Sequence, residues 1–126
     1  MIYQGMCTSF KVGLLNGDFD FGTGTTQTFK VALYTSAANL SASTTAYSAT
    51  NEASGAGYSA GGQALSVSVV PTSTGTTAFL SFSDVTWTAT TLTARGALIY
   101  KADGVTNPSI AVLDFGENKQ TNSGDF

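Results

Sequence analysis

The sequence predicts an all-β domain, either a small sandwich or a barrel, with one short N-terminal helix and one long loop. Short runs that alternate apolar and polar residues recur along the chain, and turn residues separate them at close spacing. The chain has 126 residues, of which 42% are hydrophobic, enough to fold and to bury one core. We therefore expect a single β-rich domain over residues 1–126.

The first expected element is a short helix over residues 6–15. Its apolar residues recur near the helical period, Thr8 or Ser9 is placed to cap its start, and Gly17 is placed to end it. Gly13 lies inside the segment and weakens a helix. The same residues alternate equally well as a short strand, which is the alternative.

Alternating apolar residues predict five strands or more after the helix. The strands are expected at Phe29–Tyr34, Leu65–Val69, Ala78–Trp87, Leu92–Lys101 and Ile110–Phe115. Pro71 is expected to end the second strand, because proline has no N–H for a sheet ladder. Gly75 marks a hairpin connection to the third strand, and residues 102–108 mark a later turn.

The C-terminal region follows a different pattern. Residues 116–124 are polar and are expected to form a turn, after which Asp125 and Phe126 begin another strand. A compact β domain rarely stops where a strand begins. We therefore expect either a truncated chain or a sheet edge that a neighbouring molecule completes.

Residues 36–62 form the most informative segment, a run of Ser, Thr, Ala and Gly that follows the first strand. The run is too long for a hairpin turn, and Tyr47 and Tyr58 distinguish it from a flexible linker. Asn51 and Glu52 lie at its centre. Tyrosine offers a large contact area at low entropic cost, so each tyrosine either contacts a partner protein or pins the loop to its own domain.

A second candidate contact segment is an N-terminal arm, residues 1–5. Its apolar residues precede any expected regular structure, and such an arm can add a strand to a partner's sheet. The expected interface residues therefore come from two segments, the arm and the loop: Met1, Ile2, Tyr3, Gln4, Tyr47, Asn51, Glu52 and Tyr58.

The surface is expected to be nearly neutral. Charged residues are only 10% of the chain, the net charge is −3, and Ser with Thr fill roughly a quarter of the positions. The five basic residues are spread along the sequence, whereas nucleic-acid binding needs clustered cations. No segment has the pattern of a membrane span or a signal peptide. We expect no nucleic-acid partner, no membrane, and synthesis in the cytoplasm.

No catalytic, cofactor or metal site is expected. The chain has no histidine, and its one cysteine, Cys7, has neither a base nor a second thiol. Asp84 and Asp114 lie in expected strands, but no pattern brings them together as a glycosidase requires. Asp114 either pairs with Arg95 across the sheet or marks a sheet edge. The Asn16–Gly22 run has calcium-loop spacing but departs from the EF-hand pattern, so we expect a polar turn.

Three segments in order, AYSATNE, GYSAGG and ARGALIY, resemble a family of small virion structural proteins of tailed phages and prophages. The opening SFKVGLLNGDFDF, the segment FKVALYTSAANL and the segment AVLDFG are similar to the same family, so the resemblance covers nearly the whole chain. Family members continue past the Gly-x-Phe of residues 124–126 with one more apolar strand, which this chain lacks. The resemblance implies a virion component and supplies no catalytic residues.

The resemblance and the neutral surface together predict a non-enzymatic capsid decoration or cement protein. It would bind the major capsid protein on the outer surface of a phage head, together with copies of itself as a trimer or another small cyclic oligomer. Burial repeated over many copies would stabilise the shell without chemistry. The alternatives are a tail, adaptor or fibre-associated module, and a carbohydrate-binding module that uses Tyr47, Tyr58 or Trp87 as stacking platforms.

Overall fold

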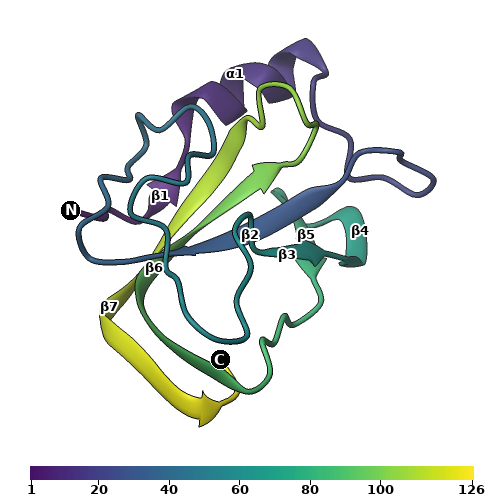
Figure 1. Ribbon diagram of the computed structural model, residues 1–126. Helices are drawn as coiled ribbons and strands as arrows, with labels where there is room; N and C mark the ends of the chain where they lie inside the picture. The colour runs from purple at the N-terminus through teal and green to yellow at the C-terminus, as the bar shows by residue number, and fades with distance from the viewer.

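The computed structural model describes residues 1–126 and shows a β-rich fold with one short helix and two antiparallel sheets (Figure 1). The larger sheet has five strands in the order β1-β7-β6-β2-β3, and the smaller sheet is the pair β4-β5. The expected β-rich fold, with a short N-terminal helix and a long loop, is confirmed. The larger sheet begins at β1 and ends at β3 without closing on itself, so the barrel alternative is wrong.

The elements follow one another in a simple order. They are β1 (Gly5–Met6), α1 (Thr8–Asn16), β2 (Phe29–Tyr34), β3 (Gln63–Leu65), β4 (Val67–Thr74), β5 (Thr77–Phe82), β6 (Thr90–Lys101) and β7 (Ser109–Gly124). The long strand β6 lies between β2 and β7 and pairs antiparallel with both. At nine residues α1 is too short to span a bilayer, and the fold has no other helix.

The N-terminal segment forms the expected helix and not the alternative strand. α1 follows Cys7, which takes the N-cap position without a side-chain hydrogen bond, so the expected capping by Thr8 or Ser9 is wrong. The helix ends at Gly17, whose left-handed φ of 78° permits the closing turn. Gly13 is buried because the Phe19 ring occupies the space where a side chain would stand, 2.5 Å from an ideal Cβ.

The pair β4-β5, which we call the ribbon (residues 67–82), departs from the sequence prediction. β4 continues through Pro71 to Thr74, because an edge strand tolerates a residue without N–H. The predicted end of the strand at Pro71 is therefore wrong, whereas the predicted hairpin turn at Gly75 is confirmed by its φ of 60°. β5 ends at Phe82 and does not reach Trp87.

The predicted polar turn over residues 116–124 is also wrong. β7 continues to Gly124, which pairs with Thr90 of β6, after a bend at Gly116 with φ 82°. This half of the strand is mostly exposed on both faces, so it has no apolar alternation for sequence analysis to detect. Beyond it, Phe126 and Trp87 exchange two backbone hydrogen bonds, of 2.8 and 3.0 Å.

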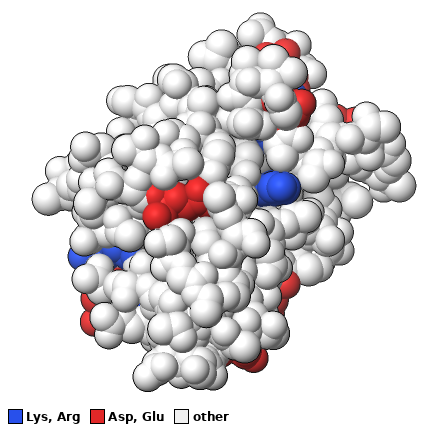
Figure 2. All heavy atoms as spheres, in the orientation of Figure 1, with Lys and Arg blue, Asp and Glu red and all other residues white.

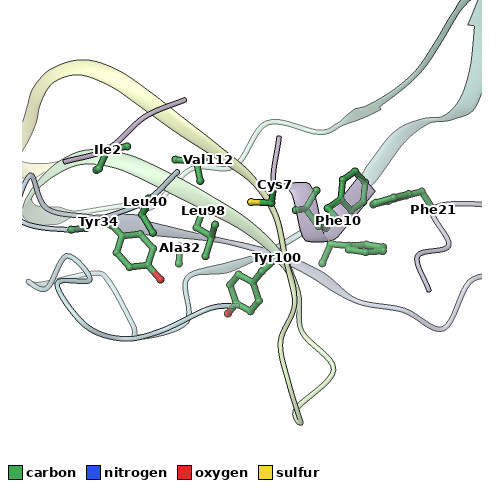
Figure 3. Packing of buried hydrophobic residues seen from close by; sticks show 13 residues of the cluster. Ile2, Cys7, Phe10, Phe21, Ala32, Tyr34, Leu40, Leu98, Tyr100 and Val112 are labelled. Atoms are coloured by element: carbon green, nitrogen blue, oxygen red, sulfur yellow. The ribbon is translucent and has the colours of Figure 1, made fainter. Parts of the chain in front are cut away.

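The main core extends from the N-terminal residues across the sheet to α1 (Figure 3). Its buried members are Ile2, Cys7, Phe10, Phe21, Phe29, Ala32, Tyr34, Ala38, Leu40, Leu98, Tyr100, Ile110 and Val112. The hydroxyls of Tyr34 and Tyr100 point to the same side of this cluster, toward the long loop. A second, smaller cluster contains Trp87 and Leu92. Charged side chains are sparse on the face shown in Figure 2.

Candidate functional site

The long loop between β2 and β3 is organised by one carboxylate. Glu52 Oε1 accepts a hydrogen bond from the Tyr47 hydroxyl at 2.6 Å. Glu52 Oε2 accepts two more, from the Tyr58 hydroxyl at 2.5 Å and from the Gly61 N–H at 2.8 Å. Both carboxylate oxygens are therefore engaged by the loop itself.

Four tyrosines connect this carboxylate and the loop to the sheet. The Tyr58 hydroxyl accepts a hydrogen bond from the Leu33 N–H of β2 at 2.9 Å. The Tyr100 hydroxyl donates to the Gly61 carbonyl at 2.6 Å, and the Tyr34 hydroxyl donates to a loop carbonyl at 2.6 Å. The Tyr47 ring stacks on the Tyr100 ring at a centroid distance of 4.7 Å. We call the set the tyrosine–glutamate cluster: Tyr34, Tyr47, Glu52, Tyr58 and Tyr100.

The cluster raises the pKa of all four of its tyrosine hydroxyls. Burial, with the negative charge of Glu52 beside it, raises the pKa of Tyr34 and Tyr100 above its ordinary value. Burial and the hydrogen bond to Glu52 raise the pKa of Tyr47 and Tyr58 in the same way. These four tyrosines therefore stay neutral and act as hydrogen-bond donors at physiological pH.

Glycines let the loop approach the sheet more closely than any side chain would permit. Gly62 has a φ of 77°, and an ideal Cβ on it would lie 1.8 Å from the Val31 carbonyl oxygen. An ideal Cβ on Gly55 would likewise lie 2.0 Å from the Thr91 carbonyl oxygen. The two expected roles of Tyr47 and Tyr58 were a partner contact and a link to their own domain, and the structure shows the link.

The N-terminal arm lies along its own loop. Ile2 is buried in the core and forms a parallel bridge with Leu40. Two backbone hydrogen bonds make this bridge: the Tyr3 N–H donates to the Leu40 carbonyl at 2.8 Å, and the Leu40 N–H donates to the Met1 carbonyl at 3.2 Å. The Gln4 side chain accepts a hydrogen bond from a β7 N–H at 3.2 Å. Met1 and Tyr3 are 69% and 59% exposed and Gln4 is exposed as well, so these three residues are the accessible part of the arm.

The structure thus separates the eight predicted interface residues into two places. It joins the loop residues Tyr47, Glu52 and Tyr58 in one cluster, while the arm packs near Leu40. Asn51 is exposed, with a φ of 61° and a side-chain hydrogen bond to the Ala37 carbonyl at 3.2 Å. Contact of these residues with a partner stays a prediction.

The charged residues singled out in the sequence make local contacts. Arg95 Nε and Asp114 Oδ1 are 2.9 Å apart, so of the two alternatives for Asp114 the structure shows the pair across the sheet. The Arg95 guanidinium lowers the pKa of Asp114. In the expected polar turn, Asp20 accepts a hydrogen bond from the Gly22 N–H at 2.8 Å, and Lys101 Nζ donates to the Asp18 carbonyl at 2.7 Å.

Sequence analysis missed an apolar groove that α1 and the ribbon form together. Its volume is about 760 Å³, and eight of its twelve lining residues are hydrophobic. Three segments line it: the N-terminal segment with Met6, Phe10 and Leu14, the loop after α1 with Phe19, Asp20, Phe21 and Gly22, and the ribbon with Pro71, Thr72, Ala78, Phe79 and Leu80. Met6, Leu14 and Phe79 are 49%, 44% and 42% exposed, respectively. The N-terminal segment and the ribbon are far apart in sequence, so no local pattern reveals the groove.

One signal in the sequence does point to the ribbon. No charged residue occurs between Glu52 and Asp84, the longest charge-free stretch around these elements.

Comparison of the chain with protein-family models, curated proteins and solved structures finds no match.

Proposed function

We propose that this protein is a non-enzymatic structural component of a phage virion, a capsid decoration or cement protein on the outer surface of the head. Its partners would be the major capsid protein and copies of itself in a small cyclic oligomer. The observation that carries the proposal is the apolar groove with its exposed rim, on a surface that is otherwise nearly neutral. We also propose that the two sheets form a small open sandwich, because Phe21 contacts both Phe29 of the sheet and Phe82 of the ribbon.

The groove supports binding by burial. Contiguous exposed apolar surface on a folded domain is one of the features of protein interaction sites. Met6, Leu14 and Phe79 contribute partly exposed apolar side chains to it, and Leu15 beside it is 90% exposed. Because few ions surround these residues, association would desolvate little charge. Many copies, each with a modest interface, would then add up to a large stabilisation of a shell.

The tyrosine–glutamate cluster supports a structural role in a different way, by fixing the long loop to the sheet. A loop that follows β2 for nearly thirty residues would ordinarily be mobile. Here hydrogen bonds of Glu52 and the tyrosines connect the loop to β2 and β6, so this face of the domain is rigid. The carboxylate is engaged by three donors, so this acid serves the fold.

The carbohydrate-binding alternative receives less support from the packing of its aromatic rings. Trp87 is only 5% exposed and contacts Phe126 and Tyr58, so its face is not open as a stacking platform. The Tyr47 ring is already stacked on Tyr100. No observation favours the tail module over the head protein, and copy number separates the two.

The first test is a count of this chain in purified particles. Quantitative gels should show hundreds of copies per particle if the protein covers a head, as repeated closed symmetry requires. A count of a dozen or fewer would contradict the head assignment and favour the tail module.

The second test concerns the groove. Leu14→Lys places a charge on the groove wall and should weaken binding to heads that lack the protein by at least about tenfold, because a buried lysine without a partner must be desolvated. Val105→Lys is the matched control, since Val105 is 86% exposed on the turn between β6 and β7, outside the groove. Equal binding by both variants would contradict the groove as the contact surface.

A further inference from the structure

We propose that two copies of this chain pair through the outer edge of β5, antiparallel about a twofold axis, so that two ribbons form one four-stranded sheet. The proposal deepens the self-association named in the proposed function. It rests on that function only for its place in a virion, because the pairing itself needs no phage head.

The ribbon is a sheet that its own domain leaves incomplete. It contains only β4 and β5, and no third strand pairs with either. Apart from Val67, Leu80 and Phe82, every residue of the two strands is exposed. A two-stranded sheet of this kind is marginally stable in water, and each strand presents a row of unpaired N–H and C=O groups along its outer edge. A further strand would satisfy these groups.

The two edges of the ribbon are not equivalent. Pro71 removes one donor from β4. The pairing also shifts twice along the ribbon: between Val67 and Val69 and again between Val69 and Thr72, β4 advances one residue more than β5. Both extra residues therefore lie in β4 and bend it, as β-bulges do. β5 has no proline and no extra residue, so its edge is the regular one.

Charge indicates that the partner is a second copy. β2, β6 and β7 each carry charged residues, whereas β4 and β5 carry none. The chain has a net charge of −3, so two copies repel each other overall, and a contact surface without charged residues adds no like-charge contact to this repulsion. They approach without like-charge contact at the ribbon. Edge strands of monomeric proteins are commonly protected by lysine, and β5 lacks this protection.

A twofold axis lets the β5 strands of two copies pair with each other, because both strands have the same sequence and neither carries a charge. In an antiparallel pair about such an axis, every hydrogen bond made by one copy is repeated by the other. Phe79 lies near the middle of β5 and is 42% exposed. It would therefore stand close to the axis, where the partner's Phe79 covers part of its exposed ring.

The test measures the mass of the purified protein in solution, by light scattering after size exclusion and by sedimentation, over a wide range of concentration. Wild type should be a concentration-dependent dimer. Phe79→Lys should weaken dimerisation by at least about tenfold, because two lysines would meet at the axis. Thr72→Lys is the matched control, since Thr72 lies directly opposite Phe79 on β4, and it should dimerise like wild type. Circular dichroism and Tm would verify that both variants fold.

A charge-swap experiment adds a second readout. Phe79→Lys and Phe79→Glu should each be monomeric alone and should form a mixed dimer together, because opposite charges then meet at the axis. If Phe79→Lys fails to fold, Ala78→Lys and its opposite neighbour Ser73→Lys replace the pair, since all four positions are exposed. A wild-type monomer at every concentration, a trimer, or equal dimerisation of the β5 and β4 variants would overturn the proposal.

The two proposals fail in different ways. A protein that dimerises through β5 but does not bind heads would overturn the proposed function alone. A protein that binds heads as a monomer would overturn the β5 pairing and the cyclic oligomer, and would leave binding to the head standing.

Discussion

The long loop and the ribbon show opposite relations between regular structure and burial. The loop between β2 and β3 has no strand of its own, yet Glu52 and the tyrosines give it a dense set of hydrogen bonds to the sheet. The ribbon is regular β-structure, yet nearly all of it is exposed and unpaired on its outer edges. Local regularity and local stability are therefore separate properties in this protein.

This difference bears on function. The loop uses its polar groups internally, so its tyrosines act as part of the scaffold. The ribbon leaves its backbone edge, Phe79 and Val70 available to another molecule. We therefore expect substitutions in the loop to change the stability of the domain and substitutions in the ribbon to change its association.

The largest contrast should come from two glycines with similar backbone conformation. Gly62→Ala should destabilise the domain by at least about 3 kcal/mol or prevent folding, because its Cβ would overlap the Val31 carbonyl, in addition to the strain of a left-handed alanine. Gly75→Ala, in the ribbon turn, has open space around its Cβ and should cost only about 1 kcal/mol. Urea unfolding of both variants measures the difference, and equal losses would contradict a close approach of the loop to the sheet.

The second contrast removes the carboxylate of the cluster. Glu52→Ala should lower the free energy of unfolding by about 2–4 kcal/mol, because the two tyrosine hydroxyls and the Gly61 N–H lose their acceptor. Glu117→Ala is the control: this exposed residue on β7 pairs only with Lys119, and its loss should leave Tm unchanged. Similar Tm values for the two variants would show that the cluster does not stabilise the loop.

A third prediction concerns alkaline pH. The pKa values of the four cluster tyrosines are raised in the folded protein, so unfolded chains release these protons more readily. Their contribution to stability is fully present below the unfolded tyrosine pKa of about 10 and is lost as pH rises beyond it, on the order of 1–2 kcal/mol at pH ~10.

Unfolding by urea at a series of pH values, with tyrosinate absorbance as a second signal, measures this loss. The absorbance of the cluster tyrosines should rise together with unfolding. A smooth titration of all of them in the folded protein would contradict the buried cluster.

The smallest effect is expected in the ribbon. Val70 is 47% exposed on β4, so Val70→Thr, which keeps the branched shape, should change the free energy of unfolding by less than about 0.5 kcal/mol. Thermal unfolding of dilute, monomeric protein measures it. A loss comparable to that of Glu52→Ala would remove the contrast between loop and ribbon.

Sequence analysis found the elements whose residues alternate between a buried and an exposed face. β6 is of this kind over its first half, and β2, which is buried along nearly its whole length, showed the same alternation of residue types; both were predicted within a residue or two. It missed the outer half of β7, where both faces are polar and exposed, and it ended β4 too early at Pro71, which is harmless on an edge strand. Periodicity reports burial, so strands without a buried face are invisible to it.

The candidate site was only partly predictable for a similar reason. Tyr47, Glu52 and Tyr58 stood out as unusual residues in a bland loop, but their spacing does not show that both hydroxyls meet one carboxylate. The groove combines Leu14 with Phe79, two residues 65 positions apart, and only the tertiary fold places both on its lining.

By itself the sequence determined the β-rich composition, the short helix, the long loop between the first two long strands, and a surface with little charge. These follow from local periodicity and from residue counts, which need no knowledge of the fold. Tertiary structure alone decided the open order of the strands, the use of the tyrosines within their own domain, and the free β5 edge. Those features depend on which distant segments come together, and the backbone groups that pair or remain unpaired are the same in every residue except proline.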